Sequence, residues 1–154
     1  MVKPKSHGER VRVLVVEDSA EDRELLWRQL RQGGLDHHVK FIASGKEAWE
    51  FLTGPDSKML AKELIAIFLD LNLPGMNGVE LLRRLRNREE YAELSVIVMT
   101  SSTDPRDWEE CQRLKVIDCV SKPVTFASFA KAVADAFRSS SLETLAIEEM
   151  LFPE

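Results

Sequence analysis

The chain has few cysteines and no long apolar run, and both absences exclude certain classes of protein. It holds two cysteines in 154 residues, Cys111 and Cys119, without the spacing of a disulfide framework. We expect free, reduced thiols that are buried or half-buried. No apolar stretch approaches the roughly 18 residues of a membrane-spanning helix, and the start MVKPKSHGER lacks the apolar core of a secretory signal. These absences favour a cytoplasmic protein.

Positively charged residues are fewer than negatively charged ones. Lysine and arginine together number 21 against 26 acidic residues, so the formal net charge is −5. Binding to a phosphate backbone needs a basic surface, and nucleic acid is therefore not expected as the main ligand. The apolar fraction of 44% and charged fraction of 31% are ordinary for a globular domain. A single α/β domain of this length can bury a core without metal or disulfide support.

Three short apolar runs predict buried strands. They are rich in β-branched residues, show little alternation, and cover residues 11–16 (VRVLVV), 64–69 (LIAIFL) and 94–99 (LSVIVM). Such runs are typical of strands that are buried on both faces of a parallel sheet. Two weaker strands are expected at residues 38–42 and 118–121.

Helical patterns separate these strands. Ser19 and Asp22 form a capping-box-like start for a helix over residues 20–32, in which Leu25, Leu26 and Leu30 are expected to face the sheet. Further helices are expected over residues 45–52, 79–86, from 105 onward, and 126–137, with an extra helical turn within 56–63. The charge-rich stretch 83–90 (RRLRNREE) is expected to be a solvated helix face and loop.

Regular alternation of strands and helices predicts an α/β fold. We expect a flavodoxin-like (βα)5 three-layer sandwich with a parallel sheet in the strand order 2-1-3-4-5. Residues 1–10 are expected to form an N-terminal tail and residues 11–138 the domain. Residues 139–154 form a C-terminal extension, read as a linker with room for a short helix. Its apolar residues fit either a frayed end or a segment that docks on a partner subunit.

Polar residues follow four of the predicted strands. Glu17 and Asp18 end the first strand, Asp70 the third, Thr100 the fourth and Lys122 the fifth. In a doubly wound sheet these strand ends meet at one edge, where ligand sites form. Clustered carboxylates need protons or a cation, and hard oxygen ligands suit Mg²⁺. An aspartate at such a site can act as a nucleophile and carry a phosphoryl group.

These residues lie in four blocks, VLVVEDSAEDRELL, FLDLNLPGMNG, VIVMTSS and SKPV. In order and spacing the blocks resemble the signature of response-regulator receiver domains, over roughly residues 11–138. The resemblance implies that Asp70 is the phosphoacceptor of a two-component system. The phosphoryl group would come from a sensor histidine kinase or a phosphotransfer protein. The blocks look most like those of stand-alone receivers that partner phytochrome-type sensor kinases.

The resemblance also implies roles at the site. Mg²⁺, with Mn²⁺ as an alternative, would be held by Asp18, Asp70 and the backbone carbonyl of Asn72, with Glu17 acting mainly through water. Thr100 and Lys122 would contact the phosphoryl group, and the Lys122–Pro123 bond is expected to be cis. Asn72 and Ser102 are expected to tune the lifetime of the acyl phosphate, and Ser101 and Ser102 belong to the switch region that follows Thr100.

One residue departs from the family pattern. Cys119 stands three residues before Lys122, where receivers often place a tyrosine or phenylalanine that rotates on activation. Trp108 lies on the helix that belongs to the usual signalling face of receivers. Output is expected through conformational change, protein contact, or dimerisation by the face of the fourth helix, fifth strand and fifth helix or by the C-terminal extension.

Three other functions are alternatives to a phosphorylated receiver. A pseudo-receiver that binds partners without phosphorylation stays open because of Cys119. An aspartate-nucleophile phosphatase of the haloacid-dehalogenase kind needs a second aspartate where this chain has Asn72. A flavodoxin needs a phosphate-binding loop of small and hydroxyl residues where this chain has EDSAED. The preferred hypothesis is a phosphoacceptor that catalyses its own phosphorylation and dephosphorylation, and not a metabolic enzyme.

Overall fold

The computed structural model describes residues 11–101 and 105–138. The elements follow one another in the order β1 (Val13–Val16), α1 (Ala20–Gln32), the 3₁₀ helix η1 (Asp36–His38), β2 (Val39–Ile42), α2 (Gly45–Leu52), α3 (Ser57–Glu63), β3 (Ala66–Asp70), α4 (Gly78–Arg86), the 3₁₀ helix η2 (Glu89–Tyr91), β4 (Ser95–Thr100), α5 (Pro105–Arg113), β5 (Asp118–Ser121) and α6 (Phe126–Arg138). The five strands form one parallel sheet in the order β2-β1-β3-β4-β5, as predicted. The predicted N-terminal tail and C-terminal extension lie outside the described residues.

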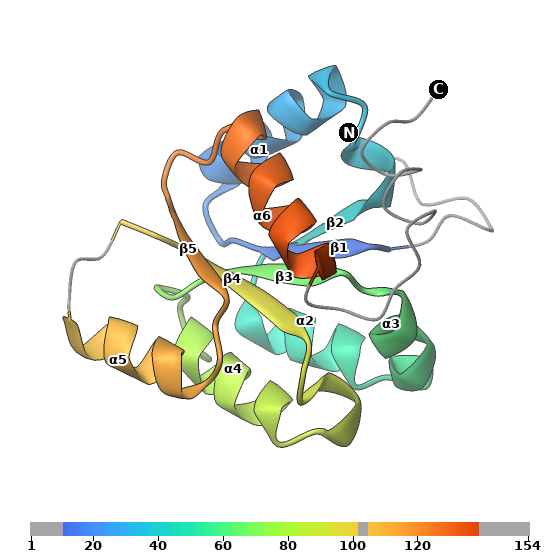
Figure 1. The fold of residues 1–154 in the computed structure, drawn as a ribbon, viewed down its shortest axis with the longest axis vertical. Coiled ribbons are helices and arrows are strands. Elements are labelled where there is room, and N and C mark those ends of the chain that lie inside the picture. The colour runs from blue at the N-terminus through green and yellow to red at the C-terminus, as the bar shows by residue number, and fades with distance from the viewer. Residues whose placement is uncertain (1–10, 102–104, 139–154) are drawn as a thin grey trace.

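The sheet is covered by helices on both faces (Figure 1). Side chains of β1 alternate between two cores, since successive residues of a strand point to opposite faces. Val13 and Val15 pack with residues of α1 and α6, whereas Leu14 and Val16 pack with residues of α2 and α4. Both faces are therefore apolar, which explains the runs of buried residues in the central strands.

The pairing register brings the strand ends to a common edge. Val16 pairs with Leu69, Asp70 with Met99, and Thr100 with Ser121. The residues that follow β1 and β5 and the last residues of β3 and β4 thus lie at the carboxyl edge of the sheet.

Helix α1 has the predicted bounds but only part of the predicted orientation. Ser19 caps it by accepting from the Asp22 N–H at 3.2 Å, and Leu26 and Leu30 are buried. Leu25 does not face the sheet, because it is 50% exposed. One residue turns a helix by about 100°, so Leu25 falls beside the stripe that Leu26 and Leu30 define.

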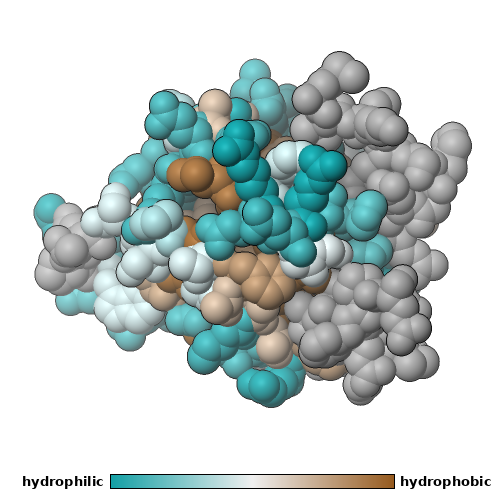
Figure 2. Space-filling model, turned by 90° about the horizontal axis from the view of Figure 1, so that it is seen from above, coloured by the Kyte–Doolittle hydropathy of each residue, from teal (hydrophilic) through white to brown (hydrophobic). Residues whose placement is uncertain are grey.

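The predicted extra turn before β3 is the helix α3. The prediction for residues 83–90 is wrong in part, because Arg86 is half-buried and its guanidinium donates to several backbone carbonyls. No helix in the described residues is long and apolar enough to cross a membrane. On the face of the molecule shown in Figure 2, hydrophobic areas lie among hydrophilic residues.

Candidate functional site

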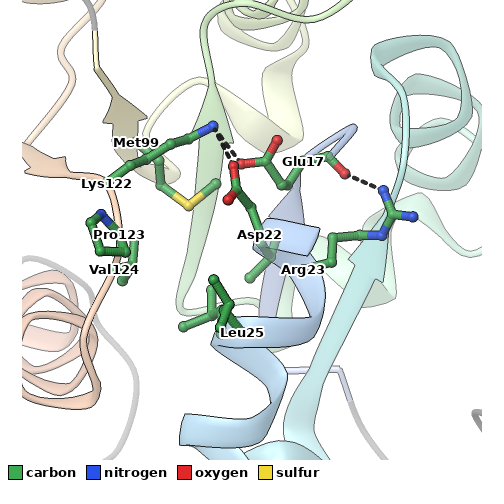
Figure 3. Close-up of a pocket in the computed structure, with 10 residues that line it drawn as sticks. Glu17, Asp22, Arg23, Leu25, Met99, Lys122, Pro123 and Val124 are labelled. Atoms are coloured by element: carbon green, nitrogen blue, oxygen red, sulfur yellow. Dashed lines mark hydrogen bonds and ion pairs between the residues drawn. The ribbon is translucent and has the colours of Figure 1, made fainter. Parts of the chain in front are cut away.

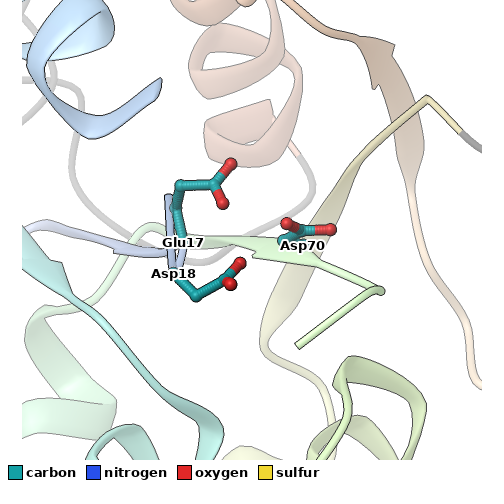
Figure 4. Close-up of side chains that lie close together, drawn as sticks. All are labelled: Glu17, Asp18 and Asp70. Atoms are coloured by element: carbon teal, nitrogen blue, oxygen red, sulfur yellow. The ribbon is translucent and has the colours of Figure 1, made fainter. Parts of the chain in front are cut away.

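Three carboxylates meet at the carboxyl edge of the sheet. Glu17 and Asp18 follow β1, Asp70 ends β3, and one carboxylate oxygen from each residue lies within 4.8 Å of the others (Figure 4). Glu17 and Asp70 are buried, whereas Asp18 is exposed. The cluster therefore has a protected side within the sheet and one member open to solvent.

Backbone and side-chain donors hold two of these residues in place. The Ser19 N–H donates to Glu17 Oε2 at 3.1 Å, and Arg23 Nη1 donates to the Glu17 carbonyl at 2.8 Å. The Asn72 N–H donates to Asp70 Oδ1 at 2.9 Å. Because the carboxylates are oriented by the chain itself, a ligand that needs them in this arrangement meets little reorganisation cost.

Lys122 reaches the cluster from the residue after β5. Its Nζ lies 2.8 Å from Asp70 Oδ2 and 2.5 Å from Glu17 Oε1. The Lys122–Pro123 peptide bond is cis, as expected. The structure thus places an ammonium group against the same aspartate that belongs to the carboxylate cluster.

Burial and charge act in opposite directions on Lys122. Desolvation alone would lower its pKa, but the hydrogen bonds to Asp70 and Glu17 and the charges of both carboxylates outweigh it, and the pKa of Lys122 is raised. Burial raises the pKa of Glu17, although the contact with Lys122 and the Ser19 N–H work against that rise. The ammonium is therefore firmly protonated at neutral pH.

The turn after β3 fits closely over Asp70. Gly75 has a φ of 70°, which a residue with a side chain rarely adopts. A Cβ at Gly78 would collide with the Asp70 carbonyl oxygen, so glycine is needed there for the close approach. The Asn77 side chain then caps α4 by accepting from the Glu80 N–H at 2.9 Å. These turn residues let the chain pass close to the backbone of Asp70 as it leaves the site.

The remaining predicted residues differ in how far they are exposed to solvent. Thr100 is half-buried at the end of β4, and Ser101 and Pro123 are exposed. Asn72 is exposed and lines a surface groove together with Asp18. Ser102 lies outside the described residues.

The elements α5 and β5 carry two of the predicted residues, Trp108 and Cys119. Trp108, on α5, is 42% exposed. Cys111 is buried as expected, but Cys119 is exposed, so the prediction of a buried or half-buried thiol is wrong for it. The reason is the edge position of β5, in which only Val120 is buried.

The donor set fits a divalent cation of the hard type. Carboxylate oxygens are the ligands that Mg²⁺ prefers, and Mg²⁺ commonly uses only one or two protein carboxylates and keeps several waters. Asp18 is the member that solvent reaches, and Glu17 and Asp70 already share Lys122. The cluster of Glu17, Asp18 and Asp70 could therefore hold a metal ion.

Sequence reasoning missed two residues of the site, Asp22 and Arg23. Asp22 was assigned only to the helix cap, yet its Oδ2 lies 3.6 Å from Lys122 Nζ. Helical spacing could have predicted the position of Asp22, because it lies about one turn after Asp18 and so returns to the same side of the chain.

The fold and this site define a class of protein. The family model described as the response regulator receiver domain matches residues 13–134, and the chain belongs to that family. The sequence is 33% identical over 112 residues to the two-component response regulator ORR3 of Oryza sativa subsp. indica, which covers 73% of this chain and 79% of the relative. It is 28% identical over 134 residues to a chemotaxis protein CheY homolog of Campylobacter jejuni, covering 86% of this chain and 97% of the relative.

Solved structures include receivers of phytochrome systems. The bacteriophytochrome response regulator AtBRR is 31% identical, with a TM-score of 0.69, and the match covers 87% of this chain and 98% of that one. The bacteriophytochrome response regulator RtBRR is 30% identical, with a TM-score of 0.70, and the match covers 87% of this chain and 82% of that one. The predicted family and its flavodoxin-like fold are therefore confirmed.

Proposed function

We propose that this receiver domain accepts a phosphoryl group on Asp70 in a Mg²⁺-dependent reaction and acts as a switch. The observation that carries the proposal is the position of the Asp70 carboxylate. It is buried, oriented by the Asn72 N–H, 2.8 Å from the Lys122 ammonium, and part of the cluster with Glu17 and Asp18. An aspartate held in this way has both a positioned nucleophilic oxygen and a cation beside it.

The reaction would proceed by in-line displacement at phosphorus. An oxygen of Asp70 forms a bond to phosphorus while the bond from phosphorus to the donor breaks, and the electron pair of that bond leaves with the donor group. Lys122 would stabilise the negative charge on the phosphoryl oxygens, and the hydroxyl of Thr100, the last residue of β4, would hydrogen-bond one of them. Mg²⁺ held by Asp18, Asp70 and the Asn72 carbonyl would neutralise further charge, with Glu17 acting mainly through water. Mn²⁺ fits the same oxygen donors.

A sensor histidine kinase or a phosphotransfer protein is the proposed donor, as for the two-component regulators to which the chain is similar. In this proposal residues 11–138 form the receiver, residues 1–10 a tail and residues 139–154 an extension, in the cytoplasm. Output would follow from movement of Thr100 toward the phosphoryl group and repacking of the face formed by α5, β5 and α6. Trp108 on α5 is 42% exposed, and Ile117 just before β5 is 38% exposed, which suits a protein contact or a homodimer.

The test is the intact mass of the protein after incubation with acetyl phosphate and Mg²⁺. We expect a gain of one phosphoryl group that is absent with EDTA and absent in Asp70→Asn. Asp118→Asn is the matched control, because Asp118 begins β5 at the opposite edge of the sheet and asparagine can still accept from the Cys119 N–H. It should be phosphorylated like the wild type. Folded wild-type protein that gains no mass would contradict the proposal and favour a binding module that works without phosphorylation.

A further inference from the structure

The first turn of α1 brings a further carboxylate to Lys122. Asp22 Oδ2 lies 3.6 Å from Lys122 Nζ, and both residues line one small pocket with Glu17 and Pro123. Figure 3 shows Asp22 on α1 beside Glu17, with the Lys122 ammonium approaching from the segment after β5. The Asp22 side chain is 42% exposed, against 4% for Glu17 and for Asp70. Asp22 is therefore the most solvent-accessible of the carboxylates that contact Lys122.

Neither the start of α1 nor the position of Lys122 depends on this side chain. The helix cap uses the backbone N–H of Asp22, which donates to the Ser19 hydroxyl. Lys122 is held by two shorter contacts, of 2.5 and 2.8 Å, to buried carboxylates. A half-exposed pair at 3.6 Å adds little to such an arrangement. What Asp22 contributes at this place is negative charge.

That charge lies 3.6 Å from the Lys122 ammonium, the group that the phosphoryl oxygens of a donor must reach. To react, a donor has to bring its phosphorus to Asp70 and its phosphoryl oxygens to Lys122. The Coulomb energy grows with the product of the charges, so a donor with two negative charges is repelled twice as strongly as one with a single charge at the same place. Removal of the Asp22 charge should therefore raise the phosphorylation rate by some factor for a singly charged donor, and by the square of that factor for a doubly charged donor.

We propose that Asp22 is a specificity-determining residue, which slows phosphorylation by small dianionic donors and favours donors that carry less negative charge or neutralise it with cationic groups of their own. The inference rests on the proposed function, in which Asp70 is the acceptor. It adds a residue that selects the donor without touching the bond that forms.

The experiment compares two donors of different charge. Initial rates of phosphorylation are measured by intact mass with acetyl phosphate, a dianion near pH 7.5, and with phosphoramidate, which carries about one net negative charge. Saturating Mg²⁺ keeps changes in metal affinity out of the comparison. The proteins are wild type, Asp22→Asn, Asp22→Glu and Glu21→Gln. Glu21 is the matched control because it is an exposed acid in the same helical turn, whereas the ion-pair partners of Lys122 in the described residues are Glu17, Asp22 and Asp70.

At low ionic strength Asp22→Asn should raise the rate about 3- to 10-fold with acetyl phosphate and about 2- to 3-fold with phosphoramidate, and roughly 0.5 M salt should remove most of both effects. Asp22→Glu should stay near the wild type, and Glu21→Gln should change either rate by less than about 2-fold. Equal factors for the two donors, unchanged rates, a slower Asp22→Asn or an equal effect of Glu21→Gln would each overturn the inference while leaving Asp70 as the acceptor. If the wild type gains no phosphoryl group from either donor, the proposed function fails and the inference fails with it.

Discussion

The two edges of the sheet each hold a partly buried cation, but with opposite kinds of partner. At the carboxyl edge Lys122 lies among carboxylates, at 2.5 Å from Glu17, 2.8 Å from Asp70 and 3.6 Å from Asp22. At the amino edge Arg86 lies among neutral backbone carbonyls, those of Leu94 at 2.7 Å, Leu114 at 2.8 Å, Tyr91 at 3.0 Å, Ala92 at 3.3 Å and Lys115 at 3.4 Å.

This difference in the partners of the two cations gives the two edges different roles. The carbonyls around Arg86 belong to loops that precede β4 and β5, so the arginine joins these loops by hydrogen bonds. Burial lowers the pKa of Arg86, but its ordinary value is so high that the charge is kept. Around Lys122 carboxylates outnumber cations, and a metal ion could offset this excess of negative charge. The amino edge therefore has a structural role, whereas the carboxyl edge could bind a ligand.

The largest expected effect is the loss of phosphorylation rate when Lys122 is replaced. Lys122→Met removes the cation that faces the phosphoryl oxygens, so the rate of phosphorylation by acetyl phosphate should fall about 100-fold. Intact-mass time courses at saturating Mg²⁺ measure it. A rate within about 3-fold of the wild type would mean that Lys122 is not a catalytic residue.

Arg86→Met should damage the fold and leave the chemistry intact. Loss of the guanidinium leaves several carbonyls of the amino edge without this donor, and the free energy of unfolding should fall by about 2–4 kcal/mol. Urea denaturation measures the loss, and the phosphorylation rate of the folded protein should stay within about 2-fold of the wild type. Arg113→Met is the control, since the Arg113 side chain is 72% exposed and should cost less than about 1 kcal/mol. A variant as stable as the wild type would show that the carbonyls need no arginine.

Tyr91 at the amino edge gives a pH test. Its hydroxyl donates to the carbonyls of Leu52 at 2.7 Å and Ser57 at 3.2 Å, and burial first and the charge of Glu90 second raise the pKa of Tyr91 to about 12. The folded state thus holds this proton more tightly than the unfolded chain, in which the pKa is about 10. The resulting stability is complete below pH 10 and is lost as the pH rises from about 10 to 12, by up to roughly 2–3 kcal/mol.

The measurement is urea denaturation of wild type and Tyr91→Phe across that alkaline range. Other groups that titrate there are common to both proteins, so the difference reports Tyr91. The wild type should lose stability more steeply than the variant. Parallel curves would show that the hydroxyl is not held as the structure describes.

The two cysteines give the smallest expected effect. Partial desolvation and the nearby charge of Asp118 raise the pKa of the exposed Cys119 thiol, and burial raises the pKa of Cys111 to about 11. A disulfide reagent at pH 7.5 should therefore modify one thiol in the folded protein, slowly, and both after denaturation. Cys119→Ser should remove the reactive thiol and change the phosphorylation rate by less than about 2-fold. A larger effect would link this strand to the chemistry.

The carboxyl edge could be predicted from the sequence because strand order and strand ends are encoded locally. Apolar runs located the strands, alternation with helices implied a parallel sheet, and a parallel sheet brings the residues after each strand together. Glu17, Asp70 and Lys122 meet for that reason alone. The extra helix α3 followed from a connection longer than a loop needs.

The amino edge could not be predicted, since its contacts join residues through the fold. A charged stretch at the end of a helix usually faces water. Arg86 lies one turn after the buried Leu82, but helical spacing alone does not show what its guanidinium contacts. Its burial depends on the loops before β4 and β5, which are distant in the chain. The exposure of Leu25 and Cys119 escaped prediction similarly, because the rotation of α1 and the edge position of β5 are set by the whole sheet.

The most direct test of the account identifies the residue that carries the phosphoryl group. The protein is incubated with acetyl phosphate and Mg²⁺, treated with sodium borohydride, which reduces an aspartyl phosphate to homoserine, and mapped by peptide mass spectrometry. We expect homoserine at the position of Asp70 and unmodified Glu17, Asp18 and Asp22. A reduced residue at any other position, or none in protein whose intact mass has risen, would contradict it.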